Sequence, residues 1–146
     1  MLKRKNPPNK GKWNGVGGRI EMGESPLESV LREVQEETGL VLKTMSFAGI
    51  MTWEGFEIKS GGLYIFSAGV DDRNVVENGE GILGWQSKAF AFNHPDVVDN
   101  IHYFLPPVLA RSNPLHYHFV YENGFIVDRS VGTLPENIYI NSLSSI

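Results

Sequence analysis

Three glutamates, Glu33, Glu36 and Glu37, fall within one stretch of five residues. On a helix, at about 100° per residue, they share an arc of roughly 100°. Like charges three and four residues apart repel each other, and Glu36 and Glu37 would also lie at the negative end of the helix dipole. A divalent cation reverses both penalties, and oxygen-only ligands favour Mg²⁺ or Mn²⁺. The alternative is a solvated acidic face of the helix.

The sequence around these glutamates predicts the helix itself. Ser25 and Glu28 have the spacing of a capping box, and Pro26 suits the first helical position. Gly39 supplies a left-handed stop. Apolar residues and one threonine recur at helical spacing and predict the buried face: Leu27, Val30, Leu31, Val34 and Thr38.

The wider pattern resembles the Nudix box at every specified position. Gly18 is followed after five residues by Glu24, and after seven more by Arg32-Glu33-Val34-Gln35-Glu36-Glu37-Thr38-Gly39-Leu40. Nudix enzymes hydrolyse a nucleoside diphosphate linked to another group, with water attacking a phosphorus of the pyrophosphate. Such chemistry requires neutralised phosphate charge, a positioned water and a base. The resemblance therefore implies a pyrophosphohydrolase that uses Mg²⁺, with Mn²⁺ as an alternative.

The resemblance also implies roles for the residues of the box. Glu36 and Glu37 correspond to metal ligands, and Glu33 to a further ligand or to the group that activates water. The carbonyl of Gly17 corresponds to another ligand. Family members differ in which carboxylate is the base, so that role stays open.

Three further polar residues belong to this expected site. Arg32 is expected to orient Glu33, with Glu24 as part of the same supporting network. The segment from Glu80 to Trp85 resembles the E-G-x-L-x-W segment of MutT-type members, in which the glutamate reaches the metal site. The alternative for Glu80 is a plain loop carboxylate.

The segments that flank the box bear on the substrate. Residues 12–18 resemble the W-N-G-x-G-G segment of MutT-type and mammalian-type enzymes that remove oxidised purine nucleoside triphosphates. On that resemblance Asn14 contacts the base and Gly18 belongs to the substrate site, although Asn before Gly also favours a plain turn. Asp99 and Asn100 align with acidic residues that read the purine edge; alternatively, Asp99 lies in the first turn of a helix.

The leading hypothesis is therefore hydrolysis of a purine nucleoside triphosphate, such as 8-oxo-dGTP, to the monophosphate and pyrophosphate. The alternatives are hydrolysis of ADP-ribose or a dinucleotide, and a Nudix domain that senses a nucleotide without cleaving it. A sensing domain usually lacks glutamates of the box, and here all of them are present.

Composition limits the class of protein. A length of 146 residues fits one domain, residues 1–146. The net charge of −4 and a pI near 5.5 argue against a protein that coats nucleic acid. Cysteine is absent, which excludes disulfides and thiolate metal sites. With no apolar run of spanning length and no signal peptide, we expect a cytoplasmic protein without membrane contact. The sequence leaves a homodimer open.

The order of predicted elements indicates an α/β protein. The resemblance implies the Nudix-type α/β/α sandwich with a mixed sheet, here lacking the usual first N-terminal strand. The residues before Trp13 are predicted to form the end of a strand and then a loop. Residues 13–18 are predicted to be irregular glycine-rich backbone. Beyond the box we predict strands over residues 40–53 and 61–70, a helix over 96–111 kinked or divided by two prolines, and a hairpin of strands 115–121 and 125–131.

Overall fold

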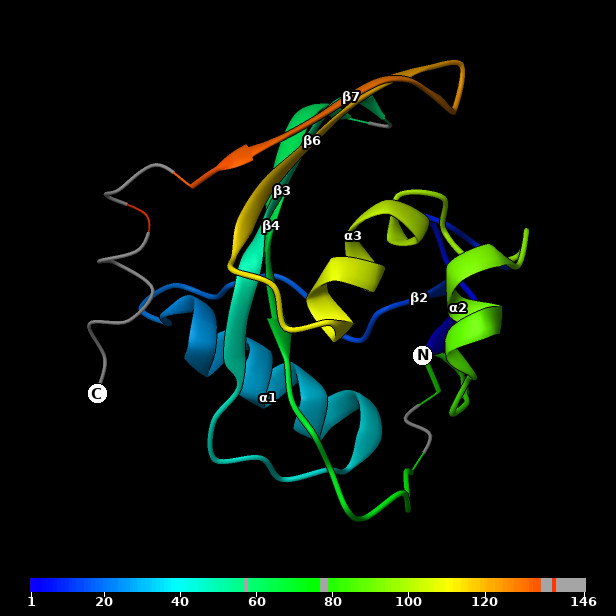
Figure 1. Cartoon of the computed structure of the whole chain (residues 1–146). Helices are drawn as coiled ribbons and strands as arrows, with labels where there is room; N and C mark the ends of the chain where they lie inside the picture. Colours follow the sequence, from blue (N-terminus) through cyan, green and yellow to red (C-terminus); the bar gives the residue numbers. More distant parts are fainter. Residues whose placement is uncertain (57, 77–78, 135–137, 139–146) are drawn as a thin grey trace. The chain divides into compact units, whose positions relative to one another are not determined.

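The computed structural model describes residues 1–56, 58–76, 79–134 and 138. The described chain forms two compact units. The first comprises residues 1–45 and 68–103, and the second comprises residues 46–67 and the chain from residue 104 onward. Figure 1 shows the helices and strands of both units.

The first unit contains a sheet of three short antiparallel strands. The strands are β1 (Leu2–Arg4), β2 (Trp13–Asn14) and β5 (Gly81–Leu83), in the order β2-β1-β5. Leu2 of β1 lies opposite Asn14 and Leu83, and only 1% of its surface is exposed. Residues 13–18 were expected to be irregular throughout, but their first two residues form β2, because β1 offers a strand edge to pair with.

Helix α1 (Pro26–Thr38) begins and ends as predicted. The Ser25 side chain accepts from the amide of Glu28, whose side chain accepts from the amide of Ser25, and Gly39 ends the helix with φ 77°. Val34 and Thr38 of the predicted buried face are buried, while the other three residues of that face are partly exposed. Ser29 and Glu37 are buried as well, so the covered face is wider than the apolar stripe.

The end of the first unit differs from the predicted long helix. A short helix, α2 (Lys88–Asn93), begins after Ser87, and helix α3 (Ile101–Leu109) begins five residues later than expected. The delay has a cause in β2, because Trp13 donates its amide to the carbonyl of Asp96 (2.7 Å) and accepts from the amide of Val98 (3.0 Å). Backbone paired with a strand in this way cannot also enter a helix.

Two prolines were expected to kink or divide this helix. The structure places Pro106 and Pro107 inside the single helix α3, so they do not divide it. Proline removes a backbone donor but keeps its carbonyl. Those carbonyls still accept from Ala110 (3.0 Å) and Ser112 (3.1 Å), so hydrogen bonding continues across the proline pair to the end of the helix.

The second unit is built on a four-stranded sheet. Its strands are β3 (Ser46–Phe56), β4 (Ile58–Ser67), β6 (Leu115–Glu122) and β7 (Phe125–Thr133), in the order β4-β3-β6-β7. The β3–β6 pair is parallel and the other pairs are antiparallel, so the sheet is mixed (Figure 1). The expected α/β class with a mixed sheet is confirmed.

Residues with positive φ occur at two features of this sheet. Strand β3 is interrupted by a register shift between Phe47 and Gly49, where Gly49 has φ 142°. The predicted hairpin turns at Asn123 (φ 52°) and Gly124 (φ 82°), the paired left-handed residues of a tight hairpin. Strands β3 and β4 are shifted relative to the predicted ranges, because their pairing continues as far as Phe56 opposite Ile58.

The core of the second unit lies on one face of this sheet. Alternate residues of β6 point into it, as period-two burial requires. Its buried members are Met51, Ile65, Val108, Tyr117, Phe119 and Tyr121. Val108 comes from α3, so the C-terminal half of that helix covers this sheet face.

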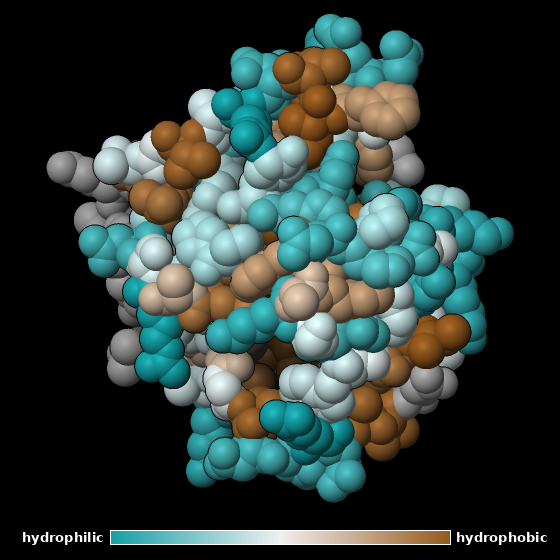
Figure 2. Space-filling view, turned by 45° about the vertical axis from the view of Figure 1, so that its right-hand side comes forward, coloured by the Kyte–Doolittle hydropathy of each residue, from teal (hydrophilic) through white to brown (hydrophobic). Residues whose placement is uncertain are grey.

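None of the described helices is long and apolar enough to cross a membrane. On the face seen in Figure 2, exposed apolar side chains form separate patches with polar side chains between them. Such scattered exposure is normal for a protein surface.

Candidate active site

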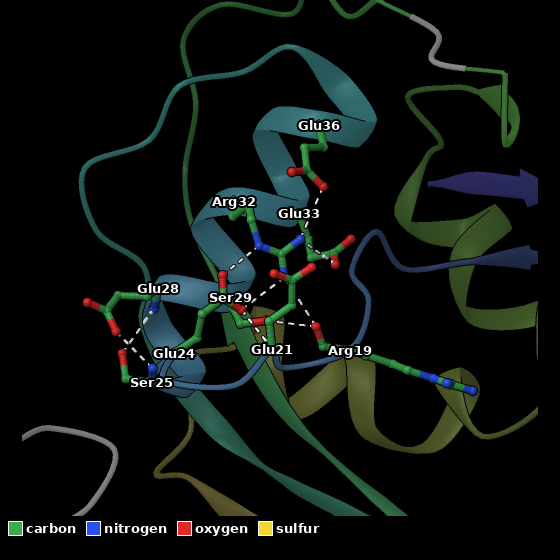
Figure 3. Close-up of polar contacts among 9 residues, drawn as sticks. All are labelled: Arg19, Glu21, Glu24, Ser25, Glu28, Ser29, Arg32, Glu33 and Glu36. Carbon is green, nitrogen blue, oxygen red and sulfur yellow. Dashed lines mark hydrogen bonds and ion pairs between the residues drawn. The ribbon is translucent and has the colours of Figure 1, made fainter.

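Arg32 stands at the centre of the predicted site and binds three carboxylates (Figure 3). Its Nε donates to Glu24 (2.6 Å) and its Nη2 to the other oxygen of the same carboxylate (2.9 Å). Its Nη1 donates to Glu33 (2.8 Å) and to Glu36 (3.1 Å), and Nη2 also reaches the carbonyl of Arg19 (3.2 Å). The planar guanidinium can hold all these acceptors because its donors form a rigid fork.

These contacts fix the charges of the network. Hydrogen bonds from Arg32 are the main reason that the pKa of Glu24 falls to about 2, and the same contacts raise the pKa of Arg32 further. Both groups therefore stay charged at neutral pH. The side chain of Glu24 is 20% exposed and that of Arg32 25% exposed, so the pair is partly shielded from water.

Glu33 is held from a second side by the glycine loop. A Cβ added at Gly18 would overlap the carboxylate carbon and both oxygens of Glu33. The loop backbone therefore lies directly against the carboxylate, and a side chain at residue 18 would push the carboxylate aside. This contact supplies a structural reason for glycine at position 18 that is independent of any substrate.

Glu37 is the buried carboxylate of the box, with 2% of its surface exposed. Its Oε2 accepts from the amide of Gly17 (2.7 Å). Burial raises the pKa of Glu37 to about 7 despite that hydrogen bond, and the neighbouring carboxylates of Glu80 and Glu33 raise it further. Glu80 lies within hydrogen-bonding reach of Glu37, so the loop that carries Glu80 is brought to the helix.

The residues present fit a divalent cation. A buried carboxylate facing a second carboxylate is unfavourable without a positive charge between them, and the donors of the neighbouring Arg32 are engaged by other acceptors. Within the described ranges no three acidic or histidine side chains are spaced as a closed metal cage. Mg²⁺ suits such an open set, because it is usually held by one or two carboxylates together with water and substrate phosphates.

The residues predicted to contact the substrate are brought onto adjoining segments. Asn14 ends β2, and its Oδ1 accepts from the amide of Gly15 (2.8 Å). The backbone of Asp96 and Val98 is bonded to the neighbouring Trp13, which sets Asp99 directly beyond this junction. Asp99 precedes α3, and its carboxylate accepts from the amide of Asn100 (2.8 Å).

Two supporting groups had no signal in the sequence. The carbonyl of Arg19 accepts from Arg32 and from the hydroxyl of Ser29 (3.4 Å). Ser29 is 3% exposed, although it was not part of the predicted buried face. The Arg19 side chain itself extends away from the cluster (Figure 3).

The arrangement of loop, helix and carboxylates agrees with comparisons to known proteins. The NUDIX domain family model matches residues 1–112. The chain thus belongs to the Nudix family, and it is a Nudix pyrophosphohydrolase.

Individual relatives support this assignment, with different sequence identities and coverages. The chain is 32% identical over 126 residues to the uncharacterised Nudix hydrolase YvcI of Bacillus subtilis, covering 81% of this chain and 77% of YvcI. It resembles the crystal structure of a MutT protein from Bacillus halodurans, with a TM-score of 0.76, 27% identity and coverage of 92% of this chain and 89% of that one. These two matches confirm the MutT-type resemblance.

Two shorter matches carry substrate names. An ADP-ribose pyrophosphatase of Methanocaldococcus jannaschii is 48% identical over 50 residues, which is 34% of this chain and 30% of that protein. An oxidized purine nucleoside triphosphate hydrolase of Danio rerio is 41% identical over 44 residues, which is 30% of this chain and 28% of that protein.

Proposed function

We propose that this Nudix hydrolase converts a purine nucleoside triphosphate to the monophosphate and pyrophosphate, with Mg²⁺ as its metal. An oxidised purine such as 8-oxo-dGTP is the favoured substrate. The observation that carries this choice is the pairing of β2 with residues 96–98, because it sets Asn14 and Asp99, the two residues expected to read a base, on adjoining segments. An amide and a carboxylate together can both donate to and accept from a purine edge.

The reaction displaces pyrophosphate with water. Water attacks a phosphorus of the triphosphate chain, and the bond from that phosphorus to the oxygen between the α- and β-phosphates breaks. Attack at the α-phosphorus releases this oxygen on pyrophosphate, and attack at the β-phosphorus releases it on the monophosphate. The proton that water loses passes to a carboxylate of the box. A bound divalent cation would supply charge neutralisation for the phosphate oxygens and would make water more acidic.

The chain's own residues supply position and charge. Glu36 and Glu37, with the carbonyl of Gly17, are the groups that would hold the metal, and Glu33 stands beside them. The fork of Arg32 and the close backbone of Gly18 restrict the Glu33 carboxylate from two sides. Fixed carboxylates lower the cost of reorganisation when charge develops on the phosphate.

A hydrolysis screen with Mg²⁺ tests the proposal. The substrates are canonical and oxidised nucleoside triphosphates, ADP-ribose and dinucleoside polyphosphates, with release of pyrophosphate or phosphate and of monophosphate measured separately. We expect the highest kcat/KM for an oxidised purine triphosphate. One of the two short matches is named for triphosphate hydrolysis and the other for ADP-ribose hydrolysis. A higher kcat/KM with ADP-ribose than with any triphosphate would therefore make ADP-ribose the substrate instead. No turnover of any compound would contradict the proposed reaction.

A further inference from the structure

Two histidines of β6, His116 and His118, share one face of the strand and approach a single hydroxyl group. Side chains alternate along a strand, and the residue between the two histidines, Tyr117, belongs to the core and is 2% exposed. On the parallel strand β3, Oγ1 of Thr52 lies 2.8 Å from Nε2 of His116 and 2.8 Å from Nδ1 of His118. The two imidazoles therefore direct ring nitrogens at one point, on the face of the sheet opposite the core.

The hydroxyl of Thr52 can donate to only one of these two nitrogens, because it carries one hydrogen. The other nitrogen has to donate to the hydroxyl oxygen. A neutral imidazole carries one hydrogen, which can sit on either ring nitrogen. With that hydrogen on the outer nitrogen of each ring, both inner nitrogens present lone pairs. Two converging imidazole lone pairs suit a transition-metal cation, whereas Mg²⁺ prefers oxygen ligands.

Glu54 of β3 favours the form of His118 that can bind a cation. Its Oε1 lies 3.9 Å from Nε2 of His118, which is the ring nitrogen that does not contact Thr52. A carboxylate at this position attracts the ring hydrogen to Nε2 and leaves the lone pair on Nδ1. Histidines that bind metals commonly have a carboxylate beside their other nitrogen, which fixes the position of the hydrogen and the orientation of the ring.

The surroundings leave room for a cation and its water ligands. The side chain of His118 is 30% exposed and that of Glu54 is 64% exposed. On β7 the residue opposite His116 is Gly132, and a Cβ there would meet no described atom within 4 Å. The described part of the chain holds no group of three acidic or histidine side chains placed to bind a metal, so water would complete the coordination.

We propose that His116 and His118 form a second metal site, which binds a transition-metal ion of the zinc and copper type. Zn²⁺ binds imidazole nitrogen at about 2.0–2.1 Å, so the two rings turn toward each other and release Thr52 when the ion binds. Both histidines lie in the second unit, and neither belongs to the box. The site is therefore separate from the proposed Mg²⁺ site and goes beyond the proposed hydrolysis.

Copper binding to the full chain tests this site. Equimolar Cu²⁺ is added in the presence of excess Mg²⁺, which competes for the carboxylates of the box, and pulsed electron paramagnetic resonance counts the coordinated imidazoles. We expect two imidazoles in the parent protein. The variants His116→Gln and His118→Gln should each retain one imidazole. Each should lower Cu²⁺ affinity by about tenfold or more, because a second ligand on the same strand acts at high effective concentration.

His94→Gln is the matched control, because it removes one imidazole at the end of α2 in the first unit. It should keep the two-imidazole spectrum and the Cu²⁺ affinity of the parent. Zn²⁺ should raise the melting temperature of the parent and of His94→Gln in the same Mg²⁺ buffer, and much less that of either β6 variant. If circular dichroism shows that one β6 variant does not fold, the other variant and the parent spectrum decide the question.

Three results would overturn the site: fewer than two imidazoles in the parent spectrum, an unchanged spectrum and affinity in both β6 variants, or the same loss in His94→Gln. These measurements involve neither nucleotide nor turnover. Failure of the proposed hydrolysis would therefore leave the second metal site standing, and a parent protein without the two-imidazole spectrum would contradict only that site.

Discussion

The backbone of Gly18 lies so close to the carboxylate of Glu33 that a Cβ at residue 18 would overlap all three carboxylate atoms. The glycine of the box thus positions a side chain fifteen residues away in sequence. The contact joins the glycine loop to α1 through a charged group, and Arg32 also holds that group with a hydrogen bond of 2.8 Å.

Replacing Gly18 with alanine should therefore displace Glu33. We expect Gly18→Ala to lower kcat by about 10²-fold, the usual cost of moving a catalytic group by about 1 Å. The measurement is steady-state hydrolysis with Mg²⁺ at saturating substrate. The matched control is Gly15→Ala in the same loop, because a Cβ there would meet no atom within 4 Å. Equal losses in both variants would show that the loop, and not the Glu33 contact, is responsible.

Replacing Glu37 with glutamine should separate activity from stability. The amide preserves shape and can still accept from Gly17, but it removes a buried charge that faces Glu80. We expect kcat to fall by about 10²–10⁴-fold. The melting temperature of the metal-free protein should stay equal or rise, because the repulsion between carboxylates is gone.

Glu21→Gln is the matched control for this variant, since it makes the same change at an exposed position of the loop before α1. It should leave both kcat and melting temperature near the parent values. A Glu37→Gln variant that retains turnover and changes only in nucleotide affinity would favour a sensing domain over an enzyme.

Local sequence determined the elements whose signals involve near neighbours. The capping box of Ser25 and Glu28, the stop at Gly39 and the turn at Asn123-Gly124 each depend on residues within one or two turns of chain. Those elements appear where the sequence predicted them. The contact of Arg32 with Glu36 could also be predicted, because helical geometry brings residues four apart together, whereas its contact with the adjacent Glu33 has no such basis.

Features that depend on distant partners could not be predicted in the same way. Helix α3 begins late because Asp96 and Val98 bond to Trp13, and no local signal announces that pairing. Glu37 has the chemistry of a surface residue, yet it is 2% exposed. The position of Arg4 beside Gly81 depends on the strand pairing of β1 with β5, more than 70 residues away along the chain.

Acid should weaken the contact between Glu24 and Arg32. The folded pKa of Glu24 is about 2, below its ordinary value of 4.5, mainly because Arg32 donates hydrogen bonds to the carboxylate. The contact therefore stabilises the fold at pH values above 4.5 and is lost as the pH falls from 4.5 toward 2. We expect Glu24→Gln to be less stable than the parent at neutral pH, with the difference shrinking across that window.

Chemical denaturation at a series of pH values measures this difference. The comparison between the two proteins cancels the titration of carboxylates that they share. The control is Glu21→Gln, whose difference from the parent should be small at every pH. A stability difference for Glu24→Gln that does not change between neutral pH and pH 3 would contradict the role assigned to this ion pair.

The fork of Arg32 should matter for metal binding even when the charge is kept. Arg32→Lys preserves one positive charge beside Glu33 and Glu36, so long-range attraction for a cation is little changed. A lysine ammonium cannot hold Glu24 with two bonds and also reach the other two carboxylates. We expect affinity for Mn²⁺, measured by electron paramagnetic resonance in the absence of nucleotide, to fall by about 10-fold or more, as for other groups that orient metal ligands.

Lys43→Arg, at an exposed position beyond α1, should leave that affinity unchanged. Unaltered Mn²⁺ affinity in Arg32→Lys would mean that the carboxylates of α1 find the metal without the guanidinium holding them.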